Sequence, residues 1–396
     1  MRLPPLTLLL CLAAVCAGCG SSSDPAKPGD AGDPVVTALY PAGAGPGEAV
    51  RIEGSGFGDT RAQPQGQVSV GGVEAVIEDW SDARIDFVMP DGIVGNWVPV
   101  QLTIGGESTD AGSMGAWEPG VIQLTNYVGG TGAGEATWSP DGQWIYYTLR
   151  MGYDESPPNQ YDIWRVPSRG GVPERVTSTP YNENWPDVWS NTGQIAFGRD
   201  GTATGNTDGD YDIWVMGFGL VEAVDPNFAT QSFLDRTPAW SRDVELGISI
   251  AWSSEDDLGQ PVIRMGGSGA VSIYGAGFNP RFDPLDGRHI VYGSYNGQVP
   301  YLYVGDILDG SYTLLNTPET FRGTGDWGVN GKIVYVSGDG LGDLWTIDPD
   351  GTNASLLYGS PSSEGGPRWS PTADRVVFGS HRFGNFDLYV YTLPPE

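Results

Sequence analysis

Short runs of alternating apolar and polar residues cover residues 34 to 110, and turns rich in Gly and Pro separate them. Alternation with a period of two is typical of strands that bury only one face. About seven such strands predict a β-sandwich, because two antiparallel sheets of this size enclose one common core. The clearest runs are residues 50–53, 68–70, 75–77, 85–88 and 98–104.

The stretch EATWSPDGQWIYYT at residues 135–148 is one copy of a pattern that returns along the rest of the chain. Each copy has an aromatic anchor, a polar turn, a buried second strand and a third strand that usually opens with Asp. Self-similarity at a period of roughly 40 to 50 residues indicates a propeller or an array. Six copies therefore predict a six-bladed β-propeller, although Val262 and Tyr301 stand where blades three and four should have Asp. The anchors are Trp138, Trp189, Trp240, Phe282, Trp327 and Trp369.

Residues 121–125 have the pattern of an outer strand, but no blade of their own precedes them. The last copy, residues 368–392, has three strands and lacks a fourth. We expect the N-terminal strand to complete the last blade and close the ring, which hides the sheet edges of an open propeller. Residues 112–120, just before this strand, are expected to form a hinge-like connector.

Two family resemblances agree with this all-β assignment. Residues 34–112 resemble the IPT/TIG family of immunoglobulin-like domains in the GSGFG run at 54–58 and in the YP and WS pairs at 40–41 and 80–81. Residues 113–396 resemble the TolB-type propeller in the SPDG turn at 139–142 and in FGSHRFGN at 378–385. The first resemblance implies a spacer or binding module. The second implies a protein-docking face at the channel of the propeller.

The N-terminus has the pattern of an export signal. Arg2 precedes an apolar run at residues 3–17 that is too short for an ordinary membrane span. The run ends in CAGC and resembles the bacterial lipoprotein signal, although Cys16 stands where that family prefers Leu. The resemblance implies that residues 1–18 are removed and that Cys19 is lipidated, and a plain secretory signal is the alternative. Residues 19–33 are expected to be a flexible tether. Because no Asp follows Cys19, the outer membrane is the expected destination.

Charge and cysteine content narrow the possible functions. The formal net charge is −29 and the sequence pI is about 4.1, so the surface repels phosphate backbones and nucleic-acid binding is not expected. All 3 cysteines lie within the signal segment and its end. After lipidation the mature chain would have no free thiol, which excludes disulfides and thiol chemistry.

Five charged residues lie one to three positions before their anchors in the repeat. We expect them to form the channel rim where the innermost strands begin. A rim of mixed charge suits a peptide terminus, a sugar acid or a loop of a partner, and a merely solvated rim is the alternative. These candidate binding residues are Glu135, Asp187, Arg281, Asp326 and Arg368.

Two other groups of residues have side chains that could carry chemistry. Asp208, Asp210 and Asp212 alternate like the start of a calcium loop, but the Gly and Glu that such a loop needs later are missing. Calcium is therefore the one open cofactor hypothesis. The two histidines, His289 and His381, fall in different blades, so no nucleophile and base system is predicted.

The sequence thus predicts an exported, lipid-anchored and monomeric protein of the cell envelope. We expect a non-catalytic binding or scaffold role, in which one face of the propeller is presented to an envelope protein or a glycan. The alternative is a surface carbohydrate-active enzyme, a hydrolase or lyase that uses Glu135, Asp187 and Asp326 as acid and base.

Overall fold

The computed structural model describes residues 33–58, 66–128, 130–152, 160–200, 210–217, 234–241, 249–267, 270–338, 341–382 and 384–395. The export signal, Cys19, nearly all of the tether and Asp208 lie outside these ranges, so the predictions made for them stay predictions. Within the described ranges every regular element is a strand, and no helix there is long and apolar enough to cross a membrane.

The N-terminal domain is the predicted β-sandwich. Its inner faces alternate with exposed positions along each strand, as in β8, where Val98, Val100 and Leu102 are buried. Phe57 is also buried and closes the sandwich beside Trp80, whose indole nitrogen donates to the Phe57 carbonyl at 3.2 Å. One sheet has the order β1 (Val35–Tyr40), β3 (Ala49–Ser55), β7 (Arg84–Val88) and β6 (Val76–Ser81). The other contains β2 (Gly43–Ala44), β9 (Glu107–Ala116), β8 (Gly95–Ile104), β4 (Gln67–Val70) and β5 (Val73–Glu74).

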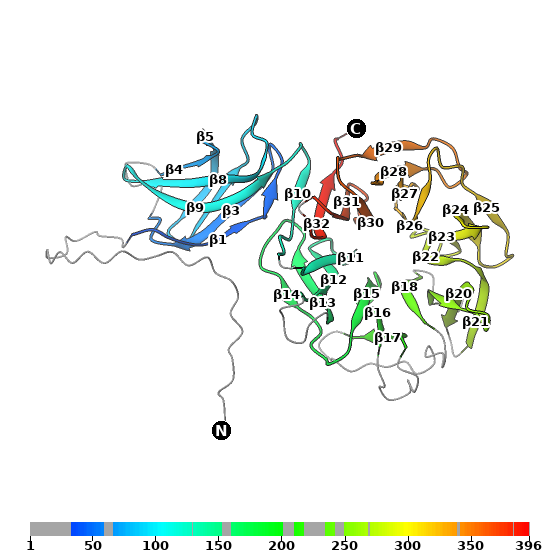
Figure 1. The fold of residues 1–396 in the computed structure, drawn as a ribbon. Coiled ribbons are helices and arrows are strands. Elements are labelled where there is room, and N and C mark those ends of the chain that lie inside the picture. The colour runs from blue at the N-terminus through cyan, green and yellow to red at the C-terminus, as the bar shows by residue number, and fades with distance from the viewer. Residues whose placement is uncertain are drawn as a thin grey trace, which may run out of the picture.

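The remainder of the chain forms six antiparallel blades around a central channel (Figure 1). The six-bladed prediction is confirmed, and the least regular blade, blade three, has four strands. Blade one consists of β11 (Gly132–Trp138), β12 (Trp144–Arg150), β13 (Tyr161–Pro167) and β14 (Glu174–Arg175). Blade two contains β15 (Glu183–Val188), β16 (Ile195–Arg199) and β17 (Asp212–Met216). Blade three consists of β18 (Arg236–Trp240), β19 (Ile250–Glu255), β20 (Pro261–Gly267) and β21 (Ala270–Ala276). Blade four consists of β22 (Phe278–Phe282), β23 (His289–Asn296), β24 (Val299–Asp306) and β25 (Tyr312–Leu314). Blade five consists of β26 (Phe321–Trp327), β27 (Ile333–Ser337), β28 (Asp343–Ile347) and β29 (Ser355–Tyr358). Blade six consists of β30 (Glu364–Trp369), β31 (Arg375–Ser380), β32 (Asp387–Thr392) and an outer strand from earlier in the sequence.

That earlier strand is β10 (Val121–Gln123), which closes the ring as predicted. It pairs antiparallel with β32, with Ile122 opposite Val390. Figure 1 shows β10 beside β32 although they lie at opposite ends of the propeller sequence. The sixth blade is thus built from both ends of the domain, and no outer edge of β32 is left unpaired.

The aromatic anchors link neighbouring blades at the ends of the innermost strands. The rings of Trp189 and Trp240 stack with their centroids 4.8 Å apart. The indole nitrogen of Trp138 donates to the carbonyl oxygen of Arg368 in blade six at 3.1 Å.

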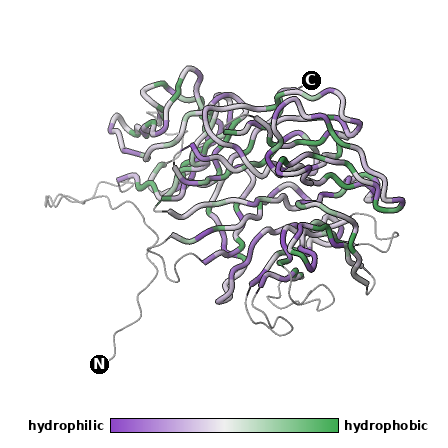
Figure 2. The backbone as a smooth tube through the Cα atoms, turned by 45° about the vertical axis from the view of Figure 1, so that its right-hand side comes forward, coloured by the Kyte–Doolittle hydropathy of each residue, from purple (hydrophilic) through white to green (hydrophobic). Residues whose placement is uncertain are grey.

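Hydrophobic and hydrophilic residues are interspersed along the strands of both domains (Figure 2). The period-two pattern therefore corresponds to side chains that face alternate sides of each blade.

The two domains share one continuous sheet, and this corrects the prediction of a hinge. Strand β2 of the sandwich pairs antiparallel with β10 of the propeller and parallel with β9. The result is a nine-stranded sheet that runs from β30 to β5. Strand β9 also continues to Ala116, so the predicted domain boundary at residue 112 falls inside it. Backbone hydrogen bonds, not a flexible linker, therefore connect the domains.

The connector after β9 is buried against the propeller. Trp117 is buried, and the guanidinium of Arg382 lies 5.3 Å from its ring centroid and 4.8 Å from that of Tyr389. Arg382 also pairs with Glu118 of the connector at 3.2 Å. The Arg382 side chain, which is largely withdrawn from water, holds the connector against blade six through these ring contacts and this ion pair.

Candidate functional site

A β-bulge interrupts the innermost strand of every blade, where its register with the second strand shifts. The residue at each bulge has a positive φ, a conformation that residues other than Gly rarely adopt. Bulges change the direction of side chains and are frequent next to functional sites. The channel has two mouths: innermost-strand residues before and at the bulges line one, and innermost-strand residues after the bulges line the other. The bulge residues are Glu135 (φ 51), Trp185 (φ 56), Thr237 (φ 48), Asn279 (φ 51), Gly323 (φ 87) and Gly366 (φ 57).

The narrow mouth lies where the innermost strands end. Its cavity has a volume of about 110 Å³, and four of the five predicted rim residues line it: Asp187, Arg281, Asp326 and Arg368. The prediction placed them where these strands begin, which is the wrong end. The anchors stand at the C-terminal ends of the strands, so residues just before them must lie at that end as well.

The charges of the narrow mouth serve contacts between blades. Asp187 accepts the backbone N–H of Trp240 in the next blade at 2.9 Å. Asp326 likewise accepts the N–H of Trp369 at 2.8 Å, and its carboxylate lies 3.7 Å from Arg368. Arg281 is buried and donates to the carbonyl of Pro238 in blade three at 2.9 Å. These side chains hold adjacent innermost strands together, which is a structural role.

The wide mouth lies at the other end of the channel, where the innermost strands begin. Its cavity has a volume of about 770 Å³, within the range of ligand pockets. Blades one, two, three and six contribute to it. Glu135 is the one predicted rim residue that lines it. The other polar and aromatic residues of the wide mouth are Arg150, Tyr161, Asn184, Trp185, Tyr211, Arg236, His381, Asn385 and Phe386.

Trp185 is at the centre of the contacts in the wide mouth. Its backbone N–H donates to the Thr148 hydroxyl of blade one at 3.1 Å, and its ring meets Tyr211 edge to face at 5.0 Å. The Asn184 amide donates to the Tyr211 hydroxyl at 2.8 Å. The Arg236 guanidinium lies 5.9 Å from the Trp185 ring centroid. An arginine, an amide and two aromatic rings are thus held in one fixed arrangement.

Glu135 is the one carboxylate among the described residues of the wide mouth. The Glu135 side chain is exposed to the channel, but the protein around the channel shields it from bulk water. This burial raises the pKa of Glu135, and the positive charge of Arg281 opposes the increase. Glu135 and the carboxylates of the narrow mouth line different cavities, so the predicted acid and base set is not brought together.

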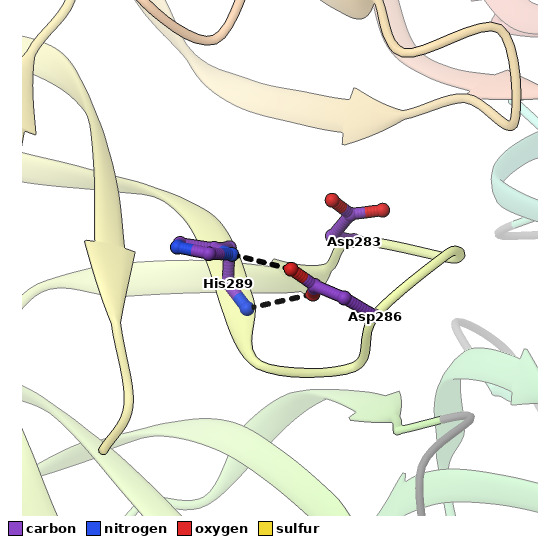
Figure 3. A group of neighbouring side chains, drawn as sticks. All are labelled: Asp283, Asp286 and His289. Carbon is purple, nitrogen blue, oxygen red and sulfur yellow. Dashed lines mark hydrogen bonds and ion pairs between the residues drawn. The ribbon is translucent and has the colours of Figure 1, made fainter.

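Asp283, Asp286 and His289 form a separate cluster at the turn between β22 and β23 (Figure 3). Their potential ligand atoms lie within 4.8 Å of one another. The turn itself uses these atoms, because Asp283 accepts the N–H of Leu285 at 2.8 Å and Asp286 contacts the His289 ring nitrogen Nδ1 at 2.6 Å. Asp283 occupies the position that Ser139 holds in blade one, where the hydroxyl accepts a turn N–H at 2.9 Å. The cluster is therefore the form that the repeated turn takes in blade four.

The structure adds functional candidates that the sequence pattern did not indicate. Arg150, Trp185, Arg236 and His381 belong to three different positions of the repeat, so no common spacing marks them. The position of Trp185 at the bulge could have been found from a closer alignment of the anchors. For the calcium hypothesis, Asp212 is the buried first residue of β17, and Asp208 lies outside the described residues.

Comparison with known proteins identifies the N-terminal domain. Residues 34–116 match the model of the family described as IPT/TIG domain. The match ends at Ala116, which is the last residue of β9 in the sandwich. The chain therefore consists of an IPT/TIG domain joined to a six-bladed propeller, and the IPT/TIG and TolB-type resemblances that the sequence indicated are confirmed.

The propeller has relatives of modest similarity. An uncharacterized protein, Atu1656, from Agrobacterium fabrum is 27% identical over 186 residues, which are 45% of this chain and 61% of that protein. A TolB homolog from Chlorobium luteolum is 27% identical over 115 residues, 29% of this chain and 26% of that protein. The chain thus spans less than two thirds of either relative. The solved structure of TolB from Acinetobacter baumannii is 16% identical with a TM-score of 0.46, covering 81% of this chain and 80% of that one.

Proposed function

We propose that this protein is a non-catalytic binding module of the cell envelope and that the wide mouth of its propeller is the binding site. The observation that carries the proposal is the cavity of about 770 Å³ in which an arginine of blade three and two aromatic side chains of blade two are held by defined contacts. The site is larger than the narrow mouth, whose charges are occupied between blades. The predicted export signal and lipid anchor support the location in the envelope.

The IPT/TIG domain has a supporting role in this proposal. Because it shares a sheet with blade six, it holds the propeller in a fixed orientation relative to the tether. A lipid at Cys19 would then keep the wide mouth near the membrane, at a distance limited by the reach of the flexible tether. A rigid spacer of this kind reduces the number of orientations that a partner has to search.

The alternative, a carbohydrate-active hydrolase or lyase, needs a second carboxylate near the first. Glu135 has the raised pKa of a possible general acid and faces the wide mouth. Release of reducing sugar from envelope glycans that stops in Glu135→Gln would establish this enzyme. Binding without any released product, in both forms, is the outcome that we expect.

The binding proposal is tested with the full chain on immobilised envelope glycans and envelope proteins. Arg236→Gln should reduce specific retention at least about tenfold, because a charge-assisted contact is lost. Arg165→Gln is the matched control: Arg165 pairs with Glu174 on the outside of blade one, at 2.5 Å. Equal retention of both variants and the unaltered protein would show that the wide mouth is not the binding site.

A further inference from the structure

The wide mouth is locally basic in a strongly acidic chain. The protein has 20 basic and 49 acidic residues, yet the part of this cavity that the structure describes contains Arg150, Arg236 and His381 against one carboxylate, that of Glu135. Arg236 is exposed, and among the described residues no carboxylate lies within ion-pair distance of it. Surface charge acts only over about 10 Å at moderate salt. The arginines can therefore attract an anion that enters the cavity despite the negative surface around it.

The aromatic residues of the wide mouth favour a ligand with rings and hydroxyl groups. Tyr161, Trp185 and Tyr211 present surfaces that are partly apolar and carry polar edges, and such side chains suit amphipathic ligands. Trp185 adopts its left-handed conformation at a cost of about 1–2 kcal/mol. Strain of this kind persists where the surrounding structure imposes it, and it is concentrated at ligand sites.

The bulges argue against an extended peptide in this site. A peptide that adds to a sheet needs a regular row of backbone donors and acceptors along one strand edge. The innermost strands present their free edges to the channel, but each is interrupted by a bulge at the border of the wide mouth. A ligand recognised through its side groups is compatible with this geometry.

On the basis of the proposed function, we infer that the wide mouth binds a carboxylate-bearing sugar, that is, a uronate residue of an acidic glycan. Arg236 and Arg150, which both line the cavity, are the residues assigned to the carboxylate, since a guanidinium matches the two oxygens of a carboxylate in geometry and charge. The sugar ring lies against the aromatic group around Trp185. Asn184 and Asn385 also line the cavity, and their amides are held by hydrogen bonds to the Tyr211 hydroxyl and the Tyr127 carbonyl.

Calorimetric titration of the full chain tests the inference. The probes are hexamers of galacturonate, mannuronate and guluronate, a carboxyl-reduced neutral hexamer of each, and hexaglutamate. We expect at least one uronate hexamer to bind, its neutral counterpart to bind at least about tenfold more weakly, and the affinity to fall with added salt. Arg236→Gln should weaken uronate binding about tenfold, and Arg165→Gln should leave it unchanged. Because Arg236 is exposed, its substitution is not expected to affect folding.

Any of four results would overturn the inference. Equal binding of a uronate hexamer and its neutral form would show that the carboxylate is not recognised. Tighter binding of hexaglutamate than of every uronate would assign the wide mouth to acidic peptides, and the proposed binding role would remain. If no uronate binds while retention on envelope material still depends on Arg236, the sugar class is wrong but the site is right. Loss of that dependence as well would reject both proposals.

Discussion

At the scale of single residues, three buried carboxyl groups have pKa values above the ordinary range for Asp and Glu. Burial raises the pKa of Glu183 and of Glu364 to about 7 and that of Asp387 to about 6. Hydroxyl groups partly offset this effect: Ser360 donates to Glu364 at 2.6 Å. Glu183 and Glu364 are the first residues of the innermost strands β15 and β30. The repeat thus places acids where their charged forms are disfavoured.

These groups predict that mild acid stabilises the protein. Each pKa is higher in the folded state than in the unfolded chain, so between about pH 4.5 and 7 the folded state binds protons that the unfolded state releases. The free energy of unfolding must then fall as pH rises through this window and level off above it. The melting temperature should be higher at pH 5.5 than at pH 8, by at least roughly 2–4 °C. Scanning calorimetry across this range measures the effect.

Glu364→Gln serves as the control for this pH dependence. The amide keeps an acceptor for Ser360 and Ser380 but does not titrate. Its melting temperature should therefore change less between pH 5.5 and 8 than that of the unaltered protein. Carboxyls with lowered pKa values, such as Asp306 at about 2, titrate below the window and do not contribute to it. A melting temperature that rises from pH 5.5 to 8 would contradict the assignment.

At the scale of elements, the closure of the ring depends on the end of β10. The Thr125 hydroxyl donates to the Asp387 carboxylate at 2.8 Å and accepts the backbone N–H of Leu388 at 2.9 Å. Both side chains are buried. In blade one, Thr177 accepts the N–H of Ile163 in the same manner, at 2.9 Å. The same repeat position therefore joins outer and third strands, but only in blade six does it join the two ends of the domain.

Thr125→Val should destabilise the propeller by about 1–3 kcal/mol, because the isosteric change leaves the buried Asp387 oxygen with one hydrogen bond fewer. Urea unfolding followed by tryptophan fluorescence measures this. The matched variant Thr177→Val removes the equivalent hydroxyl, which contacts the Ile163 N–H and the Glu183 carboxyl, and it should cost less because the two ends of the domain do not meet there. A larger loss in Thr177→Val than in Thr125→Val would show that closure is not a point of weakness in the ring.

At the scale of the whole molecule, close backbone approach at β2 joins the two domains. The Gly45 N–H donates to the Val121 carbonyl at 2.7 Å, and Trp117 N–H donates to the Ala44 carbonyl at 3.0 Å. A Cβ atom at Gly45 would overlap the backbone carbonyl of Glu118. The shared sheet therefore depends on glycine at this position.

Gly45→Val should separate the domains without unfolding them. The strands of each domain keep their own cores, and only the pairing of β2 with β10 is lost. We expect a larger radius of gyration by small-angle scattering and faster proteolysis near Trp117. Gly275→Val is the control, since a Cβ there meets no heavy atom within 4 Å. An unchanged radius of gyration in Gly45→Val would show that the connector around Arg382 holds the domains together by itself.

The sequence by itself determined the two domains, the number of blades and the strand that closes the ring. These features rest on local patterns: period-two alternation in β8, the anchor at Trp138 with its turn, and the unpaired outer strand before the first blade. Such patterns can be read along the chain because each blade repeats the same contacts with its neighbours. The role of a single residue could be predicted in the same way only where the repeat gives that position the same role in every blade.

The tertiary structure alone decided where the site lies and how the domains are joined. Asp187 and Arg281 looked like rim residues, but the closed ring places a neighbouring blade against each of them, and they bond to its backbone. Arg236 of blade three and His381 of blade six are separated by more than a hundred residues in the sequence, and they line one cavity because the closed ring turns both blades toward the same channel. Contacts of this kind depend on closure, a property of all six blades together that no single stretch of sequence contains.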